Sequence, residues 1–429
     1  MGLKNKIKMK LLSACFKGTY REYNQLLEFK KEREKLYKKL QNKEEEIKEV
    51  YEGNKVLDDE VNFLKFRNEG LIKLHDQTVE KYWNNDEKLK KYVCLNPFEN
   101  IEILSRGEVY TCCSSFIKHN HYIGNINEDG FEEIWNSKKA KQLRYSVSMG
   151  KFEYCNEHCI AIKTCDLKGT TDYFQYRKDF NFNYKNVDDC KMDTYPKIIT
   201  LSCDESCNLY CTSCRNKRKV LSKYESEKLY NTLVEKVLPL MKDCEHLSLL
   251  GSGDLFASKA CMKFLKHINK NKFPKLNLHI ITNAQLLTQS NWEQLDNLKG
   301  IPIKMDISID GAERKTYEKI RRGAKWDILL ENLKYVSLLR KNNEISYLRI
   351  NFVVQLDNFK EMRKFVKLAE KYSADEVWFQ RIANWGTIPQ AEFSKIDVFD
   401  NKNPHYDEVT LMLNRIIDEN KIKISNNCF

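Results

Sequence analysis

The sequence predicts an α/β fold, in which a partial, TIM-like (β/α)6 barrel is combined with a small cysteine-rich α+β unit and an N-terminal coiled-coil helix. Three observations support this. Apolar strand-like segments alternate with amphipathic helix-like segments from Lys197 onward, eleven of the fifteen cysteines lie between Cys94 and Cys214, and a heptad pattern runs through residues 20–90. In chain order we expect a basic N-terminal segment (1–19), a coiled coil (20–93), the cysteine-rich unit (94–166), a linker (167–195), the barrel (196–390) and a C-terminal extension (391–429).

Length and composition are those of a soluble chain. Its 429 residues are enough for two domains, one of which can be a sizeable barrel. The hydrophobic content of 41% supports packed cores, and no apolar run approaches the ~18 residues that a membrane helix needs. The net charge of +12 comes from lysines scattered among acids, so we expect no nucleic-acid partner. We expect a cytoplasmic protein with no transmembrane segment.

The first residues, MGLKNKIKMKLLSACF, are basic and then briefly apolar. The apolar stretch is shorter than the ~7 residues of a minimal signal-peptide core, which predicts that the segment is unprocessed. Lys6 stands where N-myristoylation requires Ser or Thr. A weak surface contact between this segment and a membrane remains an open alternative.

Residues 20–90 have the heptad pattern of one long helix, with ten of fourteen core positions apolar. Asn54 and Asn68, at a positions, favour a parallel two-stranded register, and we expect a homodimer. The pairs Lys39–Glu44 and Glu60–Lys65 are attractive in such a dimer. An antiparallel hairpin, or a single helix packed on its own protein, is the alternative. The a positions are Leu26, Arg33, Leu40, Ile47, Asn54, Val61 and Asn68, and the d positions are Phe29, Leu36, Lys43, Val50, Leu57, Leu64 and Leu71.

The cysteine-rich unit begins with a predicted hairpin. Ile101, Ile103 and Val109 lie on either side of a turn at 105–108, and a helix is expected at 131–147. Fifteen cysteines in a large chain without a secretion signal favour metal ligation over disulfides. Residues 167–195 show no clear period and are interpreted as a linker. Three cysteines follow the helix: Cys155, Cys159 and Cys165.

From Lys197 onward, strands and helices alternate, and this order predicts right-handed βαβ crossovers in a parallel sheet. In such barrels the active site lies at the C-terminal ends of the strands. The expected strands are Lys197–Cys203, His246–Leu250, Leu276–Thr282, Ile303–Ile309, Tyr347–Val354 and Glu376–Arg381. The expected helices between them include Ser226–Leu240, Ser258–Lys270, Trp326–Lys341 and Lys360–Tyr372.

Three cysteines follow the first strand of the barrel in the segment CDESCNLYCTSCR. Cys207-x3-Cys211-x2-Cys214 puts three thiolates on one tight loop, enough to bind three irons of a cubic 4Fe–4S cluster and leave the fourth iron open. A zinc site, or a ferredoxin-type cluster completed by Cys203, is the alternative.

This segment resembles the signature loop of the radical S-adenosylmethionine (SAM) superfamily, and the resemblance extends over about Pro196–Ile388. It implies that the open iron chelates SAM, and that reductive cleavage of SAM gives a 5′-deoxyadenosyl radical that abstracts hydrogen from a substrate. The cofactor supplies the difficult chemistry and the protein supplies placement and electrostatics. A flavodoxin- or ferredoxin-type electron donor is then an expected partner. Ser213 stands where the family often has an aromatic residue.

Further matches fall at successive strand ends. Gly251-Ser252-Gly253-Asp254 resembles the family's Gly-Gly-Glu motif, which receives the amino group of SAM on backbone carbonyls and an acid. Asn283 ends the third strand, and Ser308-x-Asp310-Gly311 ends the fourth, where the family often contacts the ribose. Arg321 and Arg322 match a basic position that often meets the SAM carboxylate. No catalytic acid, base or radical-quenching residue is identified.

The cysteine-rich unit resembles a SPASM or twitch domain, which binds auxiliary iron–sulfur clusters, although it precedes the barrel here. The resemblance implies one auxiliary 4Fe–4S cluster on Cys94, Cys112, Cys155 and Cys159. A structural zinc is the alternative. Possible substitute ligands are Cys113, Cys165, Cys190 and Cys203.

Three hypotheses follow. The first is an enzyme that abstracts hydrogen from an unactivated carbon of a peptide or sugar-like substrate, with the auxiliary cluster accepting an electron or anchoring the substrate. The second is an adaptor, with a coiled coil that recruits a partner and cysteines that bind structural zinc. The third is an iron–sulfur electron-transfer protein without a substrate of its own.

Overall fold

The computed structural model describes residues 89–117, 121–156, 159, 162, 174–176, 182–249, 252–385 and 387–428. The basic N-terminal segment and nearly all of the predicted coiled coil lie outside the described residues, so the homodimer stays a prediction. Cys165 and Gly251 also lie outside them. Among the described helices, none combines the length and apolar character needed to cross a membrane.

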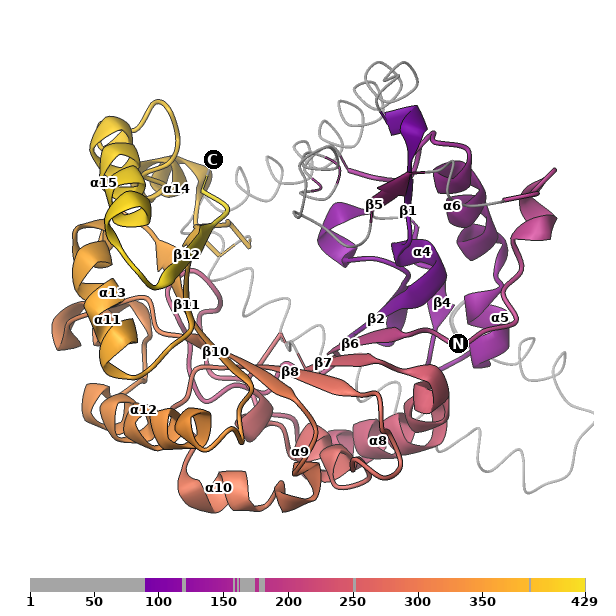
Figure 1. Ribbon diagram of the computed structural model, residues 1–429, viewed down its shortest axis with the longest axis horizontal. Helices are drawn as coiled ribbons and strands as arrows, with labels where there is room; N and C mark the ends of the chain where they lie inside the picture. The colour runs from indigo at the N-terminus through magenta and orange to yellow at the C-terminus, as the bar shows by residue number, and fades with distance from the viewer. Residues whose placement is uncertain are drawn as a thin grey trace, which may run out of the picture. The chain divides into compact units, whose positions relative to one another are not determined.

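All six expected barrel strands are present, and they pair in sequence order as a parallel sheet (Figure 1). The partial TIM-like α/β barrel predicted from the sequence is confirmed. Two parallel strands extend it: β2 (Asn100–Leu104) pairs with β6, and β12 (Lys423–Asn426) pairs with β11. The six expected strands are β6 (Ile198–Ser202), β7 (His246–Leu249), β8 (Asn277–Thr282), β9 (Ile303–Ser308), β10 (Tyr347–Val354) and β11 (Glu376–Arg381).

Helices cover one side of this sheet (Figure 1). Phe352 of β10 is fully buried against Phe365 of α13, so alternate residues of β10, among them Arg349 and Asn351, face the opposite side. The α-helices of the barrel are α8 (Lys223–Thr232), α9 (Lys259–Leu265), α10 (Gln289–Glu293), α11 (Arg314–Ile320), α12 (Trp326–Lys341), α13 (Met362–Lys371), α14 (Gln390–Ile396) and α15 (Tyr406–Glu419). Short turns of helix occur at η7 (Leu255–Ala257), η8 (Asp296–Leu298) and η9 (Phe359–Glu361).

The helix expected at Ser226–Leu240 differs from the prediction. It begins earlier, as α8, because the Ser222 side chain accepts a hydrogen bond from the Glu225 amide and the Glu225 carboxylate accepts one from the Ser222 amide. After Thr232 it continues as a π-helical turn, η5 (Leu233–Val237), and a 3₁₀ segment, η6 (Leu238–Asp243). Pro239 accounts for the loss of regular α-helix, since it has no amide proton to donate.

The predicted hairpin is confirmed: β2 pairs antiparallel with β3 (Glu108–Tyr110), and Gly107 takes the left-handed conformation (φ 86°) that the turn requires. The helix expected at 131–147 is broken into α5 (Phe131–Trp135) and α6 (Lys138–Ser148), because Ser137 caps the second helix. The unit also contains η1 (Leu89–Lys91), β1 (Tyr92–Cys94), α4 (Asn96–Glu99), η2 (Ser114–Phe116) and β4 (Gly124–Asn125).

The described part of residues 167–195 packs on the cysteine-rich unit. Its strand β5 (Phe174–Tyr176) pairs antiparallel with β1, and the short helix η4 (Val187–Cys190) follows. The indole of Trp135 donates to the carbonyl of Thr194 (2.9 Å). These contacts fix the segment in place, whereas its assignment as a linker between domains stays a prediction.

Candidate metal and cofactor site

The three-cysteine loop lies at the C-terminal edge of the sheet, directly after β6. The Cys207 amide donates to the Lys219 carbonyl (2.7 Å), which closes the base of the loop. The Cys214 amide donates to the Cys211 carbonyl (3.0 Å), which makes the tight turn expected from the spacing. The amide of Tyr210 donates to the carbonyl of Arg322 (3.1 Å). The loop is therefore anchored at both its base and its tip.

Two arginines lie beside the thiols. The Nε of Arg215 is 3.5 Å from the sulfur of Cys214, and its two Nη atoms donate to the carbonyls of Glu205 and Ser252. Burial lowers the pKa of Arg215, but the sulfurs of Cys214, Cys207 and Cys211 outweigh burial and raise it. Arg215 is thus a counter-charge beside Cys214 that also interacts electrostatically with Cys207 and Cys211.

Arg321 is the second cation at the loop. Its Nη1 lies 3.8 Å from the sulfur of Cys211, and its Nη2 forms an ion pair with Asp310 (2.7 Å). Its Nε is buried and has no hydrogen-bond partner among the described residues. A buried, unpartnered guanidinium nitrogen fits an anionic ligand such as a carboxylate.

Burial raises the pKa of the Cys207 thiol to about 11 and also raises that of Cys211, although Arg215 and Arg321 partly oppose these shifts. Thiolates in this loop therefore need compensating positive charge, which a bound metal centre supplies. The side-chain amide of Asn283 donates to Asn208 (2.9 Å) and lies 3.9 Å from the sulfur of Cys207. The expected strand-end residue Asn283 is thus next to the cysteine loop.

Gly253 packs directly against the start of the cysteine loop. A Cβ at this position would lie 2.2 Å from the carbonyl oxygen of Ser206, so only glycine fits. The amide of Asp254 donates to the same carbonyl (2.7 Å), and the Ser252 hydroxyl donates to the Ser202 carbonyl (3.2 Å). The described part of the expected Gly-Ser-Gly-Asp motif therefore holds the end of β7 against the loop.

The two expected acids point into the protein. The carboxylate of Asp254 accepts hydrogen bonds from the Thr282 hydroxyl (2.8 Å) and the amides of Asn283 (2.7 Å) and Phe256 (3.0 Å). The carboxylate of Asp310 accepts from the Val353 amide (2.7 Å) and pairs with Arg321. Both are buried, and burial raises the pKa of each. In this structure they organise neighbouring strand ends rather than present free oxygens.

Ser308 lies half-buried at the end of β9, where it pairs in register with Asn351 of β10. The side-chain oxygen of Asn351 is buried and has no partner among the described residues. Both residues are on the side of the sheet that the helices leave free.

The four cysteines expected to bind the auxiliary cluster line one buried pocket: Cys94, Cys112, Cys155 and Cys159. The remaining wall is largely apolar, with Leu143 and Val147 of α6 among its residues. The side-chain amide of Asn96 lies 3.7 Å from the sulfur of Cys112. Burial raises the pKa of Cys94 to about 12 and raises that of Cys112 well above its ordinary value. Four thiols around one apolar pocket are a donor set that fits an iron–sulfur cluster.

Within the described ranges, no group of three or more His, Cys, Asp or Glu side chains is arranged to hold a metal ion. A single zinc needs its sulfurs about 2.3 Å from one point. In a cubic 4Fe–4S cluster each thiolate binds a different iron, so the four sulfurs do not have to lie around a single point.

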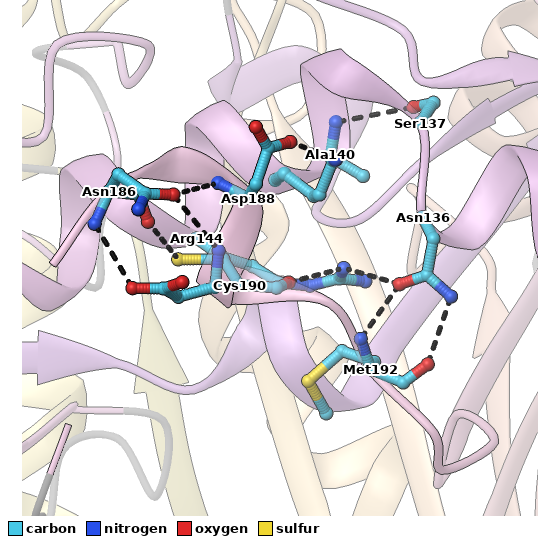
Figure 2. A network of polar contacts seen from close by, with 10 residues as sticks. Asn136, Ser137, Ala140, Arg144, Asn186, Asp188, Cys190 and Met192 are labelled. Carbon is cyan, nitrogen blue, oxygen red and sulfur yellow. Dashed lines mark hydrogen bonds and ion pairs between the residues drawn. The ribbon is translucent and has the colours of Figure 1, made fainter. Parts of the chain in front are cut away.

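Of the possible substitute ligands, Cys113 is adjacent to Cys112 but exposed, and Cys165 is outside the described residues. Cys190 is buried, and the guanidinium of Arg144 donates to its carbonyl (3.3 Å) (Figure 2). The same guanidinium donates to the carbonyl of Pro97 (2.8 Å). Cys203 is buried and shares a hydrogen bond with Cys261 of α9. The structure therefore gives Cys190 and Cys203 other neighbours than the four cysteines of the pocket.

Sequence reasoning missed Arg215, although it directly follows Cys214, a position that could have marked it as a counter-charge. It also missed a polar network on the helix-free side of the sheet. Asp306, fully buried, pairs with Arg349 and lies 3.0 Å from Nε2 of His279. No local motif identifies this network, because its members come from three different strands.

Two family models match the segments that contain these cysteines. Residues 94–165 match SPASM, described as an iron–sulfur cluster-binding domain, and residues 203–369 match the Radical SAM superfamily. The chain carries a radical SAM domain preceded by a SPASM domain. These domains imply a 4Fe–4S cluster with SAM at the barrel and auxiliary iron–sulfur binding in the SPASM unit. The recognition made from the sequence is confirmed, including the N-terminal place of the SPASM domain.

Solved structures similar to this radical SAM–SPASM chain include SuiB from Streptococcus suis bound to SAM, with 17% identity over 54% of this chain and 50% of that one and a TM-score of 0.40. SuiB bound to its precursor peptide SuiA matches over 69% of this chain and 64% of that one, with 16% identity and a TM-score of 0.40. A radical SAM methyltransferase from Sphaerobacter thermophilus matches at 9% identity over 52% and 64% of the two chains, with a TM-score of 0.34. The chain matches about half the length of SuiB. No curated protein matches.

Proposed function

We propose that this protein is a cytoplasmic, oxygen-sensitive radical SAM enzyme that abstracts hydrogen from a peptide or sugar-like substrate. Cys207, Cys211 and Cys214 hold the 4Fe–4S cluster that binds SAM. The observation that carries this proposal is the three-cysteine loop at the C-terminal edge of a parallel sheet, with two arginines beside its sulfurs. When bound, the cluster supplies the electron that cleaves SAM to methionine and a 5′-deoxyadenosyl radical.

The residues of the chain position SAM and balance the charge of the thiolates. Arg215 neutralises the thiolates, and Arg321, through its unpartnered Nε, is suited to the carboxylate of SAM. We assign the backbone carbonyls of the Gly-Ser-Gly-Asp motif at residues 251–254 to the SAM amino group, and Asn283, Ser308 and Asp310 lie at neighbouring strand ends. Because the carboxylates of Asp254 and Asp310 already accept protein hydrogen bonds, we assign them to holding these strand ends in place.

The polar side of the sheet supports a polar substrate. The charged groups of four residues lie on this side of the sheet: Glu102, Asp306, Arg349 and Glu376. They are largely buried, and they form hydrogen bonds or ion pairs with other residues. A surface of this kind suits the amides of a peptide or the hydroxyls of a sugar better than a hydrocarbon chain. The auxiliary cluster on Cys94, Cys112, Cys155 and Cys159 then either accepts the substrate electron, which makes the reaction an oxidation, or anchors the substrate.

The test is cleavage of SAM by anaerobic, reduced protein, measured as 5′-deoxyadenosine by chromatography. The Cys207→Ala, Cys211→Ala, Cys214→Ala triple variant should lose cleavage to background while it keeps iron in the auxiliary site. Undiminished cleavage of SAM by this variant would contradict the assignment of the SAM-binding cluster to these three cysteines.

Metal analysis separates this proposal from the other two hypotheses. Iron with acid-labile sulfide supports the enzyme or a simple electron-transfer protein, whereas zinc supports a structural adaptor. Cleavage of SAM then distinguishes the enzyme from the electron-transfer protein.

A further inference from the structure

The segment that follows Cys214 is exposed and basic. Residues 216–220 and 222–225 are exposed to solvent. Within nine positions of one another the segment carries five cations: Arg215, Lys217, Arg218, Lys219 and Lys223. Arg322, which is held against Tyr210, adds another guanidinium to the same loop. Positive charge is thus concentrated next to the cysteine loop.

The acids near this surface are already engaged. Glu205 pairs with Lys219, and Glu225 caps its own helix through the amide of Ser222. In the described part of the chain, neither Lys217 nor Lys223 forms a hydrogen bond or an ion pair with another side chain. The surface therefore keeps uncompensated positive charge.

Two apolar side chains project from the middle of the same segment. Val220 is 59% exposed and Tyr224 is 77% exposed. Exposed apolar groups surrounded by charge are typical of a protein–protein contact. We call Lys217–Lys219, Val220, Lys223 and Tyr224 the basic face.

The basic face adjoins the outermost of the three cysteines. Cys207 and Cys211 are half-buried, whereas Cys214 is exposed, and it precedes Lys217 by three positions. The face is also joined to the base of the loop, because the Cys207 amide donates to the carbonyl of Lys219 (2.7 Å).

We propose that the basic face is the docking surface for an acidic one-electron carrier protein of the flavodoxin type. This inference rests on the proposed function, because it needs a cluster on the cysteine loop. The transfer is of one electron: the carrier is oxidised by one electron and the cluster is reduced by one. That electron is the one consumed when SAM is cleaved to methionine and the 5′-deoxyadenosyl radical.

Charge complementarity fits such an encounter. Attraction between a basic face and an acidic carrier raises association rates by about 10- to 1000-fold, and the effect falls steeply with salt. Complexes between redox partners are transient and have small interfaces, so the basic face is large enough for docking.

The experiment compares two reductants on the full-length protein. Cleavage of SAM is driven either by an acidic flavodoxin with its reductase or by dithionite, which needs no docking surface. The test variant is Lys217→Glu, Lys223→Glu, and the matched control is Lys334→Glu, Lys341→Glu on α12, which makes the same change in charge at exposed positions. Flavodoxin binding is also titrated directly, without turnover, at low and high salt.

We expect the test variant to lose about tenfold or more of its flavodoxin-driven rate through a higher KM for flavodoxin, and to keep its dithionite-driven rate. Flavodoxin binding should weaken in parallel, and its salt dependence should become shallower. The control variant should behave as the wild type. A second variant, Tyr224→Ser, should weaken flavodoxin binding without altering charge.

An unchanged flavodoxin rate and affinity in both test variants would overturn the docking surface. So would an equal loss in the control, or a loss with dithionite as well, which would mean that the substitutions damage the cysteine loop. Absence of SAM cleavage by the wild type with either reductant would instead remove the proposed function, and this inference with it.

Discussion

Gly253 is the point at which the end of β7 meets the cysteine loop. Replacing it by alanine forces a Cβ to within 2.2 Å of the Ser206 carbonyl, and backbone on both sides must move. We expect Gly253→Ala to lose the barrel cluster and to retain the auxiliary one, so iron should fall by about four per chain. Inductively coupled plasma analysis of anaerobically purified protein measures this.

Gly130→Ala is the matched control. A Cβ at Gly130 meets nothing closer than 3.5 Å, and the residue does not have positive φ. Its iron content should equal that of the wild type. Full iron in Gly253→Ala would show that the loop adjusts to the extra methyl group.

Asp306 is a buried acid held by Arg349 and His279. Burial by itself would raise its pKa, but these two partners outweigh burial and keep it below the ordinary value of 3.8. We expect Asp306→Asn to cost about 3–5 kcal/mol of unfolding free energy, because it leaves Arg349 without its counter-charge. Guanidinium denaturation followed by circular dichroism measures the difference.

The pH dependence of this difference has a defined sign. A carboxyl group with a lowered folded-state pKa contributes stability above its unfolded pKa, and the contribution is lost as pH falls through the folded value. The gap between wild type and Asp306→Asn should therefore narrow as the pH falls below about pH 4. A gap that widens in acid would contradict the ion pair.

Sequence patterns brought some residues together and left the roles of others undetermined. The resemblance to a SPASM or twitch domain selected four cysteines, Cys94, Cys112, Cys155 and Cys159, and these four line one pocket. Asp254, in contrast, matches a motif position, but its carboxylate accepts hydrogen bonds from the Thr282 hydroxyl and from two backbone amides. A sequence shows that an acidic residue ends a strand. It does not show whether the carboxylate binds a ligand or accepts hydrogen bonds from neighbouring amides.

At the scale of elements, the SPASM unit provides a test by metal content. The full-length protein should contain about eight irons per chain, from one cluster in the barrel and one in the pocket. A variant with all four pocket cysteines changed to alanine should contain about four. About twelve irons in the wild type would mean that Cys165, Cys190 and their neighbours build another cluster.

Elements with a strong period were predictable, and those defined by their neighbours were not. The strand β10 is apolar at every second position and was located to the residue. The strand β12, with the sequence KISN, has little apolar character and becomes a strand because it hydrogen-bonds to β11. Similarly, periodicity extends across Asn136 and Ser137, and only the cap at Ser137 shows that two helices meet there.

At the scale of the whole molecule, the heptads predict a homodimer through residues 20–90. Six apolar d positions can each bury most of a side chain, worth ~1.5–3 kcal/mol per residue before entropy is subtracted. A chain that starts near Tyr92 should be monomeric and should keep the barrel, because the strand–helix units are complete from Lys197 onward. Light scattering on both proteins measures the masses. A monomeric full-length protein at micromolar concentration would show that the apolar seam packs on its own chain.

The pairing of β2 with β6 has a consequence for solubility. Without the SPASM unit, the amides and carbonyls of Ile198–Ser202 that now bond to Asn100–Leu104 would be left unpaired at an open strand edge. Such an edge is a template for strand addition from another molecule. Beyond β2, the sheet ends in two short antiparallel strands. The first, β3, is joined to β2 by a tight hairpin turn, and the second, β4, has two residues. We therefore expect the SPASM unit to limit self-association of the barrel through this edge.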